Sequence, residues 1–169
     1  MLATHFDAES RYNTIRKASL AAVSRQVPSG SNLDFELINE RALSTSKSWV
    51  ESKNRLVNWE WFKSYYPFKY RYPKRFELAL WHKGSLASLS LGRPTYNATG
   101  MRLDFIEGNP EYREIKVFPI VIASLATYAE ALGANELRVM NPINDEVKDY
   151  YSKFGMNYVA KGDYLYTRL

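Results

Sequence analysis

The segment from Asn109 to Ala134, NPEYREIKVFPIVIASLATYAEALGA, places two cations at the expected start of a long helix. Arg113 and Lys116 lie between Pro110 and Pro119, with no glycine among them. The first turn of a helix leaves backbone N–H groups unpaired and carries a partial positive charge, which together favour a phosphate. Charges at Arg113 and Lys116 would add to that attraction. The segment therefore predicts an anion site, with two solvated surface charges as the alternative.

Residues that commonly act as nucleophiles or metal ligands are scarce. The 169 residues include no cysteine and only two histidines, His5 and His82, which lie far apart in the sequence. Thiol nucleophiles, disulfides and thiolate metal sites are therefore excluded, and we expect no metal centre. The chain has no signal-peptide pattern at its start and no apolar run near the ~20 residues that span a bilayer. We expect a soluble cytoplasmic protein with no membrane partner.

The net charge of +5 and the isoelectric point near 9.3 favour a polyanionic partner, from a nucleotide cofactor to nucleic acid. Many small enzymes are equally basic, so solubility alone is the alternative. An apolar fraction of 46% and an aromatic fraction of 15% are typical of a globular protein. The length predicts one domain over residues 1–169 with a core of its own.

The hydrophobic pattern predicts the elements that must position these side chains. We expect a helix from Ala8 to Val27, within an N-terminal helical extension over residues 1–32, and then a strand from Leu33 to Ile38. The pattern from Arg41 to Trp61 is helical and mostly polar. It predicts one or two short helices that end near Pro67, because proline cannot continue a helix.

Three strands joined by short loops follow and predict an antiparallel meander over Phe76 to His82, Ser85 to Gly92 and Met101 to Glu107. The period then changes to that of a helix from Pro119 to Leu132, with Gly133 just past its end. The remaining elements are a strand, a helix and two strands, expected over Leu137 to Met140, Asn144 to Phe154, Met156 to Ala160 and Tyr164 to Leu169.

Two segments in this second half resemble the GNAT superfamily of N-acetyltransferases, over about residues 76 to 169. The first keeps the family's spacing at Pro110, Arg113, Tyr128, Ala129, Leu132 and Gly133. The second, NDEVKDYYSKFGM, keeps it at Asn144, Tyr151 and Gly155, and has Met156 where the family usually has Phe. The two segments stand in register around the expected strand LRVM.

The resemblance implies an α+β fold: a mixed, mostly antiparallel twisted sheet of six to seven strands, flanked by helices and splayed between its fourth and fifth strands. Acetyl-CoA would lie in that gap, with its pantetheine arm paired to the fourth strand as an added strand would be. A backbone N–H near Phe105 to Glu107 would polarise the thioester carbonyl. The implied cofactor-binding residues are Phe105, Ile106, Arg113, Ile115, Lys116, Val117, Phe118, Asn144 and Tyr151.

The loop before the long helix departs from the family pattern. The family places small residues, usually glycine, where this chain has Lys116 and Phe118, whereas Arg113 is in its place. Small residues let the backbone N–H groups approach the pyrophosphate of coenzyme A. We therefore expect either a loop of different shape that holds the phosphates further out, or a degraded cofactor site.

The resemblance implies direct attack of an amine on the thioester, with no covalent acyl-enzyme. Tyr151 would be the acid, because a phenol of pKa about 10 is protonated at neutral pH and can donate to a thiolate of pKa about 8.5. Its alternative is packing in the core. Tyr150 and Tyr151 point about 100° apart on a helix, so we expect Tyr151 to face the cleft and Tyr150 to take a core position.

The base is assigned to Glu107, at the end of the fourth strand, where the family often keeps a carboxylate. Asp104 is the other candidate, and a water chain or surface roles for both acids are the alternatives. Asn144 either contacts the cofactor or caps the helix that carries Tyr151.

The sequence therefore predicts an N-acetyltransferase that uses acetyl-CoA and a primary amine and needs no metal. One alternative is a GNAT-like binding module that has lost catalysis, which Lys116 and Phe118 favour. Another is acetylation of an RNA-borne amine such as aminoacyl-tRNA, which the positive charge permits. The aromatic and cationic segment from Asn58 to Phe76 fits an acceptor-side lid or a nucleic-acid surface, or rings that pack under Lys and Arg stems. A homodimer is compatible with all three.

Overall fold

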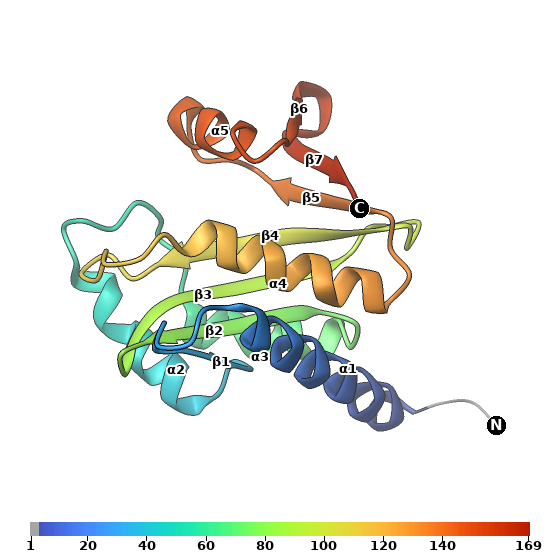
Figure 1. The fold of residues 1–169 in the computed structure, drawn as a ribbon, viewed down its shortest axis with the longest axis horizontal. Helices are drawn as coiled ribbons and strands as arrows, with labels where there is room; N and C mark the ends of the chain where they lie inside the picture. Colours follow the sequence, from blue (N-terminus) through green and yellow to red (C-terminus); the bar gives the residue numbers. More distant parts are fainter. Residues whose placement is uncertain (1–3) are drawn as a thin grey trace.

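The computed structural model describes residues 4–169, in which helices and strands alternate along the chain (Figure 1). The first half contains α1 (His5–Gln26), β1 (Leu33–Glu36), α2 (Glu40–Ser46), the 3₁₀ helix η1 (Lys47–Glu51), α3 (Trp61–Arg71), β2 (Phe76–His82) and β3 (Ser85–Pro94). The second half contains β4 (Gly100–Gly108), α4 (Val117–Ala131), β5 (Glu136–Met140), α5 (Asp145–Ser152), β6 (Asn157–Val159), the 3₁₀ helix η2 (Ala160–Gly162) and β7 (Tyr164–Arg168).

The strands form one seven-stranded sheet in the order β1-β2-β3-β4-β5-β7-β6. All neighbours in it are antiparallel except β4 and β5, which are parallel. The predicted α+β fold with a mostly antiparallel sheet of six to seven strands is confirmed. The predicted strands and the two predicted C-terminal helices all occur, with ends that shift by a few residues.

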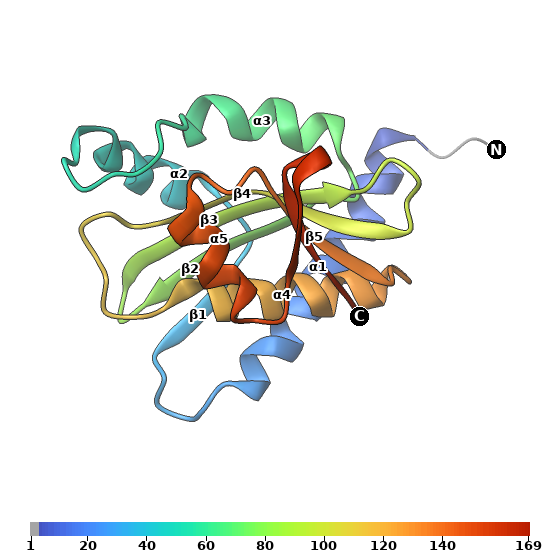
Figure 2. The same ribbon diagram turned by 90° about the horizontal axis from the view of Figure 1, so that it is seen from above.

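Helices cover both faces of the sheet (Figure 2). α1 and α4 lie on one face and α2, η1 and α3 on the other. The core on the α4 side is built from alternate strand residues, such as Leu78, Leu80, Met101 and Leu103. β2 is buried at every position because both of its faces are covered. The central strands are therefore packed against helices on both faces of the sheet.

The prediction that helix formation ends near Pro67 was wrong. Residues 52–60 form a loop, and α3 begins at Trp61 and continues through Pro67 to Arg71. A proline inside a helix loses one backbone hydrogen bond and typically costs ~3 kcal/mol. Trp61 and Tyr65, both less than 5% exposed, pack against the sheet and hold the helix in place. Tertiary packing thus outweighs the local preference.

A buried ion network fixes α1 to the sheet, which the sequence patterns did not predict. Arg75 Nη2 lies 2.7 Å from a carboxylate oxygen of Glu9 on α1 and 2.7 Å from one of Glu77 on β2. Arg16 on α1 donates to Glu9 at 2.9 Å. Tyr65 donates to Glu77 at 2.6 Å. The N-terminal segment is therefore joined to the sheet by charged groups that are shielded from water.

The sheet parts at β4 and β5. The two strands pair from Gly100 to Leu103 and from Glu136 to Val139, and beyond Leu103 β4 continues to Gly108 with no β5 partner. A bulge between Leu91 and Gly92 shifts the register of β3 against β4 just where the parting begins. A Cβ at Gly92 would stand 2.3 Å from the carbonyl oxygen of Arg102, so this bulge requires glycine.

Within residues 4–169, no helix is both long and apolar enough to cross a membrane. The same residues contain no group of three or more His, Cys, Asp or Glu side chains placed to hold a metal ion.

Candidate functional site

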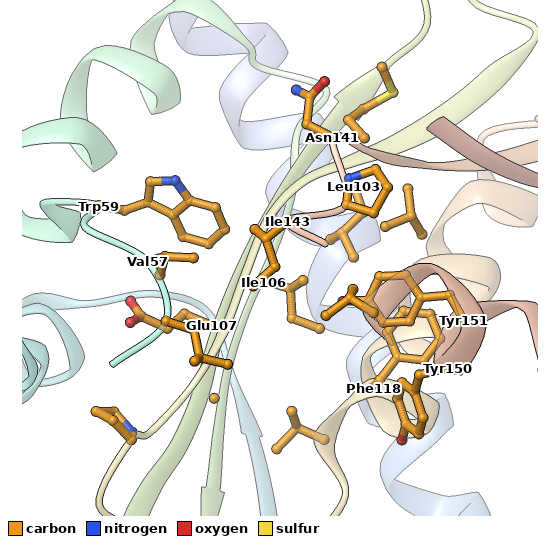
Figure 3. Close-up of a pocket in the computed structure, with 18 of the residues that line it drawn as sticks. Val57, Trp59, Leu103, Ile106, Glu107, Phe118, Asn141, Ile143, Tyr150 and Tyr151 are labelled. Atoms are coloured by element: carbon orange, nitrogen blue, oxygen red, sulfur yellow. The ribbon is translucent and has the colours of Figure 1, made fainter. Parts of the chain in front are cut away.

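A cavity of about 290 Å³ opens where β4 and β5 part (Figure 3). The end of β4 forms its floor with Ile106, and the loop before α3 contributes one wall with Trp59. The opposite wall comes from the start of α4 and from α5, with Phe118 and Tyr151. Strands, helices and a loop that are far apart in the sequence therefore converge on one groove.

The mouth of the groove is cationic. Lys116 is the N-cap residue of α4, is exposed, and forms no capping hydrogen bond with its side chain. Arg113 is also exposed and makes one long contact, 3.5 Å to the carbonyl oxygen of Asn54. Helix geometry leaves the N–H groups of Val117 and Phe118 without partners in the helix, whereas Pro119 has no N–H to offer. Two backbone donors and two cations thus face the same opening.

Phe118 turns away from this mouth. Its ring stacks on Tyr151 with centroids 4.0 Å apart and planes at 14°, and its side chain is 3% exposed. Phe154 packs against the same ring at 5.3 Å. The phenyl ring therefore fills the space between α4 and α5 and forms part of the groove wall, and the groove beside it is open.

Tyr150 and Tyr151 both line the groove, so the prediction that at most one of them faces it was wrong. α5 lies along the groove, and large rings on two adjacent helical faces reach it. Burial, with a smaller contribution from Tyr150, raises the pKa of Tyr151 to about 12. The Tyr151 phenol is therefore fully protonated at neutral pH and can act as a hydrogen-bond donor.

The free edge of β4 offers backbone groups to the groove. The N–H of Asn109 donates to Ala87 of β3 at 2.8 Å. N–H groups in an antiparallel strand alternate from side to side, so those of Ile106 and Gly108 point away from β3 and toward the parted edge. Of the segment predicted to polarise a carbonyl, Phe105 to Glu107, Ile106 is the residue whose N–H has this direction.

The side chain of Phe105 lies on the other face of the sheet. Its ring packs edge-on against Trp59 at 5.1 Å and against Trp61 at 6.3 Å. It lines a second hollow beside the main groove, together with Trp59 and Arg102. The predicted contact of Phe105 with a cofactor therefore depends on its backbone.

Glu107 lines the groove but its carboxylate is already bound. Arg55 donates from Nε to one oxygen at 2.7 Å and from Nη2 to the other at 3.0 Å, and Trp61 Nε1 donates to that second oxygen at 2.7 Å. Arg55 also bonds the carbonyl oxygen of Trp59. Glu107 thus ties the loop before α3 to the sheet, a role that sequence patterns did not indicate because Arg55 lies in a loop without a motif.

Asp104 is the second carboxylate at the groove, and it also lines the neighbouring hollow. Its side chain is 8% exposed, and burial raises its pKa even though Arg102 and Arg93 oppose that shift. Arg102 Nε donates to Oδ1 at 2.8 Å. Oδ2 accepts no hydrogen bond within residues 4–169, but Arg93 Nε lies 3.5 Å from it as an ion pair. Asp104 is therefore held by two arginines, but it accepts fewer hydrogen bonds than Glu107 does.

Asn144 lies outside the groove lining. Its side chain caps α5 and accepts from the N–H of Val147 at 2.8 Å. Of the two roles predicted for Asn144, the geometry shows the helix cap. Asn141, which the sequence reasoning missed, lines the groove instead (Figure 3).

Comparison with known proteins rests on structure, because no family model and no curated protein matches the sequence. Ard1 from Thermoplasma volcanium superposes with a TM-score of 0.64 and 12% identity, over 82% of this chain and 98% of its own. A GNAT-family acetyltransferase from Staphylococcus aureus gives a TM-score of 0.64 and 10% identity, over 81% and 99% of the two chains. The chain has the GNAT fold.

A third neighbour was solved with a ligand. It is the Paia N-acetyltransferase from Thermoplasma acidophilum in complex with coenzyme A, with a TM-score of 0.56 and 16% identity over 81% of this chain and 99% of its own. The structural likeness agrees with the GNAT resemblance that the two sequence segments carry. In this GNAT fold the groove stands where β4 and β5 separate, which is the splay that the resemblance implied.

Proposed function

We propose that the protein is an N-acetyltransferase that moves an acetyl group from acetyl-CoA to an amine by direct attack. The observation that carries the proposal is the groove at the parting of β4 and β5, with a cationic mouth at one end and an apolar floor. The coenzyme A complex of a protein with the same fold supports the choice of cofactor.

Coenzyme A fits the chemistry of this mouth. Its pyrophosphate would accept from the N–H groups of Val117 and Phe118 and meet the charges of Lys116 and Arg113. Because Pro119 removes one backbone donor, the two cations carry more of the binding than in a glycine-rich loop. The charge of Lys116 then attracts the pyrophosphate in place of the backbone N–H groups that a glycine-rich loop brings close to it.

The thioester would lie beside the edge of β4. There the N–H of Ile106 would donate to the carbonyl oxygen and stabilise the negative charge that forms on it when the amine attacks. The nitrogen forms a bond to the carbonyl carbon, and the bond from that carbon to sulfur breaks as the oxyanion collapses. The products are an amide and the thiolate of coenzyme A.

Tyr151 would assist the departing sulfur. A phenol of pKa about 12 is a weaker acid than a free tyrosine. Full transfer of its proton to a thiolate of pKa about 8.5 would be uphill by about 5 kcal/mol. Tyr151 therefore acts as a hydrogen-bond donor to the developing charge, and the proton on sulfur comes finally from water.

The amine must lose a proton before or during attack. Sequence reasoning assigned Glu107 to this step and kept Asp104 as the other candidate. The three donors on Glu107 favour a positioning role for it. Asp104 Oδ2 accepts no hydrogen bond within residues 4–169 and has only the longer contact with Arg93, and burial raises the pKa of Asp104, which together favour Asp104 as the base. Asp104 faces both the groove and the hollow beside Trp59, where an acceptor amine could enter.

The test combines turnover and binding. Purified protein, acetyl-CoA and a panel of amines (peptide N-termini, polyamines and aminoacyl-tRNA) are mixed, and release of the free thiol is measured. We expect thiol release that requires one class of amine. Acetyl-CoA at a hundredfold excess over its dissociation constant should also stabilise the fold by about 2.7 kcal/mol.

A binding module without catalysis is the second candidate, because Lys116, Phe118 and Pro119 all depart from a close-fitting phosphate loop. Stabilisation by acetyl-CoA with no thiol release for any amine would favour it. No stabilisation at millimolar acetyl-CoA would contradict the transferase and would also favour the module.

A further inference from the structure

A second cavity, of about 400 Å³, opens at the opposite end of the sheet. It lies where the start of α1, the connection from α3 to β2 and the end of β3 meet. Pro94, which lines this cavity, pairs with Met101 near the start of β4, whereas the groove between β4 and β5 lies near the end of β4. The two cavities share no lining residue. This cavity is therefore a separate feature of the molecule.

Three cations line the cavity: Arg11, Arg71 and Lys74. Within residues 4–169, none of them lies within 4.0 Å of a carboxylate oxygen. The acids nearby on α1 are engaged elsewhere: Glu9 binds Arg75 and Arg16, and Asp7 bonds the capping Thr4. The lining contains no acid, so it presents an excess of positive charge.

Ring side chains form most of the remaining wall. They are Tyr12, Tyr72, Pro73 and Pro94, of which the two tyrosines contribute flat aromatic rings. The ammonium of Lys74 stands 5.6 Å from the Tyr12 ring centroid, and the guanidinium carbon of Arg71 stands 5.5 Å from that of Tyr72. Flat aromatic faces favour contact with a planar group, and cations beside them favour a negative charge.

The wall is held in place from behind. Arg16 Nη1, on a side chain that is 1% exposed, donates to the carbonyl oxygen of Pro73 at 2.8 Å. The hydroxyl of Tyr128 donates to the carbonyl oxygen of Lys74 at 3.0 Å. The backbone between Arg71 and Arg75 is thus fixed by buried donors while its cations project outward. A ligand would meet a preorganised surface, which lowers the entropy cost of binding.

We propose that this cavity binds a small molecule in which a planar ring carries an anionic group, either a phosphate or a carboxylate. Arg11, Arg71 and Lys74 hold the anion, and the ring lies beside Tyr12 and Tyr72. The Tyr72 ring is itself held by Phe68, at 4.8 Å between centroids, and by the guanidinium of Arg93 at 4.6 Å. The ligand bridges α1 to the connection between α3 and β2. The cavity volume lies within the range of small-molecule sites, on the order of 300–1,000 Å³.

The test uses calorimetric titration of the purified protein with 1-naphthyl phosphate and with 1-naphthoate. Inorganic phosphate tests the anion without the ring, and 1-naphthol tests the ring without the anion. We expect at least one of the naphthyl anions to bind, and both partial compounds to bind at least about tenfold more weakly. The tighter of the two anions identifies the preferred head group.

Variants locate the site. Arg71→Gln and Lys74→Gln each remove one exposed charge, and each should weaken binding of the naphthyl anion about tenfold, the loss of one charge-assisted contact. Lys17→Gln, an exposed lysine of α1 outside the lining, is the matched control and should bind as the wild type does. Circular dichroism of each variant checks that the fold is unchanged.

Three outcomes would overturn the proposal. The first is that neither naphthyl anion binds at millimolar concentration. The second is that Arg71→Gln and Lys74→Gln bind the anion as tightly as Lys17→Gln does. The third is loss of binding in Lys116→Ala with retention in Lys74→Gln, which would put the probe in the GNAT groove. None of these results depends on acetyl transfer.

Discussion

Arg55 and Glu107, 52 residues apart in the chain, form a two-pronged ion pair that closes one wall of the GNAT groove. Their side chains are 7% and 5% exposed, so the pair is shielded from water. Glu107 comes from β4 and Arg55 from the loop before α3, which also carries Trp59 into the groove. This ion pair, together with the packing of Trp59 on Phe105, therefore holds the loop against the sheet on the acceptor side.

Glu107→Gln should destabilise the fold, because Arg55 would remain buried without a counter-charge. Removing one partner of a buried pair typically costs about 3–5 kcal/mol, and the amide oxygen that remains recovers part of this. We expect a loss of about 2–3 kcal/mol in urea unfolding. Glu111→Gln is the control, since Glu111 is exposed and bonds Ser52 of the same loop. A variant as stable as the wild type but inactive would instead make Glu107 the base.

Asp104→Asn should lower turnover about 10²–10⁴-fold, the usual contribution of a general base. Burial raises the pKa of Asp104 above 3.8, and only the ionised form can accept a proton. The wild-type kcat/KM should therefore fall as the pH drops through this raised pKa, and the variant should lose that limb of the profile. Asp149→Asn, an exposed acid on α5, is the control. An unchanged pH profile in Asp104→Asn would exclude Asp104 as the base.

Tyr151→Phe should keep the stack on Phe118 and lose only the hydroxyl. We expect kcat to fall about tenfold or more, because the donor acts on charge that develops at the sulfur. The dissociation constant of acetyl-CoA should change less than about twofold. Tyr150→Phe, which removes the neighbouring hydroxyl, is the control. Equal rates for Tyr151→Phe and the wild type would remove the proposed donor role.

Acid sensitivity should be traceable to Glu9. Burial tends to raise its pKa, but the hydrogen bonds and charges of Arg75 and Arg16 outweigh burial and lower it below 4.5. A carboxyl whose pKa is lowered by folding stabilises the protein above the unfolded pKa and loses that contribution as the pH falls through the folded value. Stability should therefore decline below about pH 4.5 in the wild type, and less steeply in Glu9→Gln. Parallel declines measured by urea unfolding would contradict this.

Strand alternation and the helix period predicted most helices and strands, because they are local signals that the core of this fold obeys. The parting of the sheet was expected from the resemblance to the GNAT superfamily. The sequence patterns failed at Pro67, where packing of Trp61 and Tyr65 decides the conformation. They also failed to find the contact between Arg55 and Glu107, since nothing local links a loop arginine to a strand 52 residues later.

The position of the Phe118 ring at the expected phosphate loop could be determined only from the structure. Phe118 stands where a small residue is usual, and only packing between α4 and α5 determines where its ring goes. The cofactor, the amine and the roles of Ile106, Ile115 and Val117 stay predictions, as do the cytoplasmic location and a homodimer.

The most direct test of the account is calorimetric titration of acetyl-CoA at low and high salt into the wild type and Lys116→Ala. We predict binding to the wild type that weakens with salt. Binding to Lys116→Ala should be about tenfold weaker, the loss of one charge-assisted contact, and less sensitive to salt. Lys161→Ala, an exposed lysine away from the groove, should match the wild type. Absence of binding at millimolar acetyl-CoA, or tighter binding to Lys116→Ala, would contradict a cofactor held at this helix start.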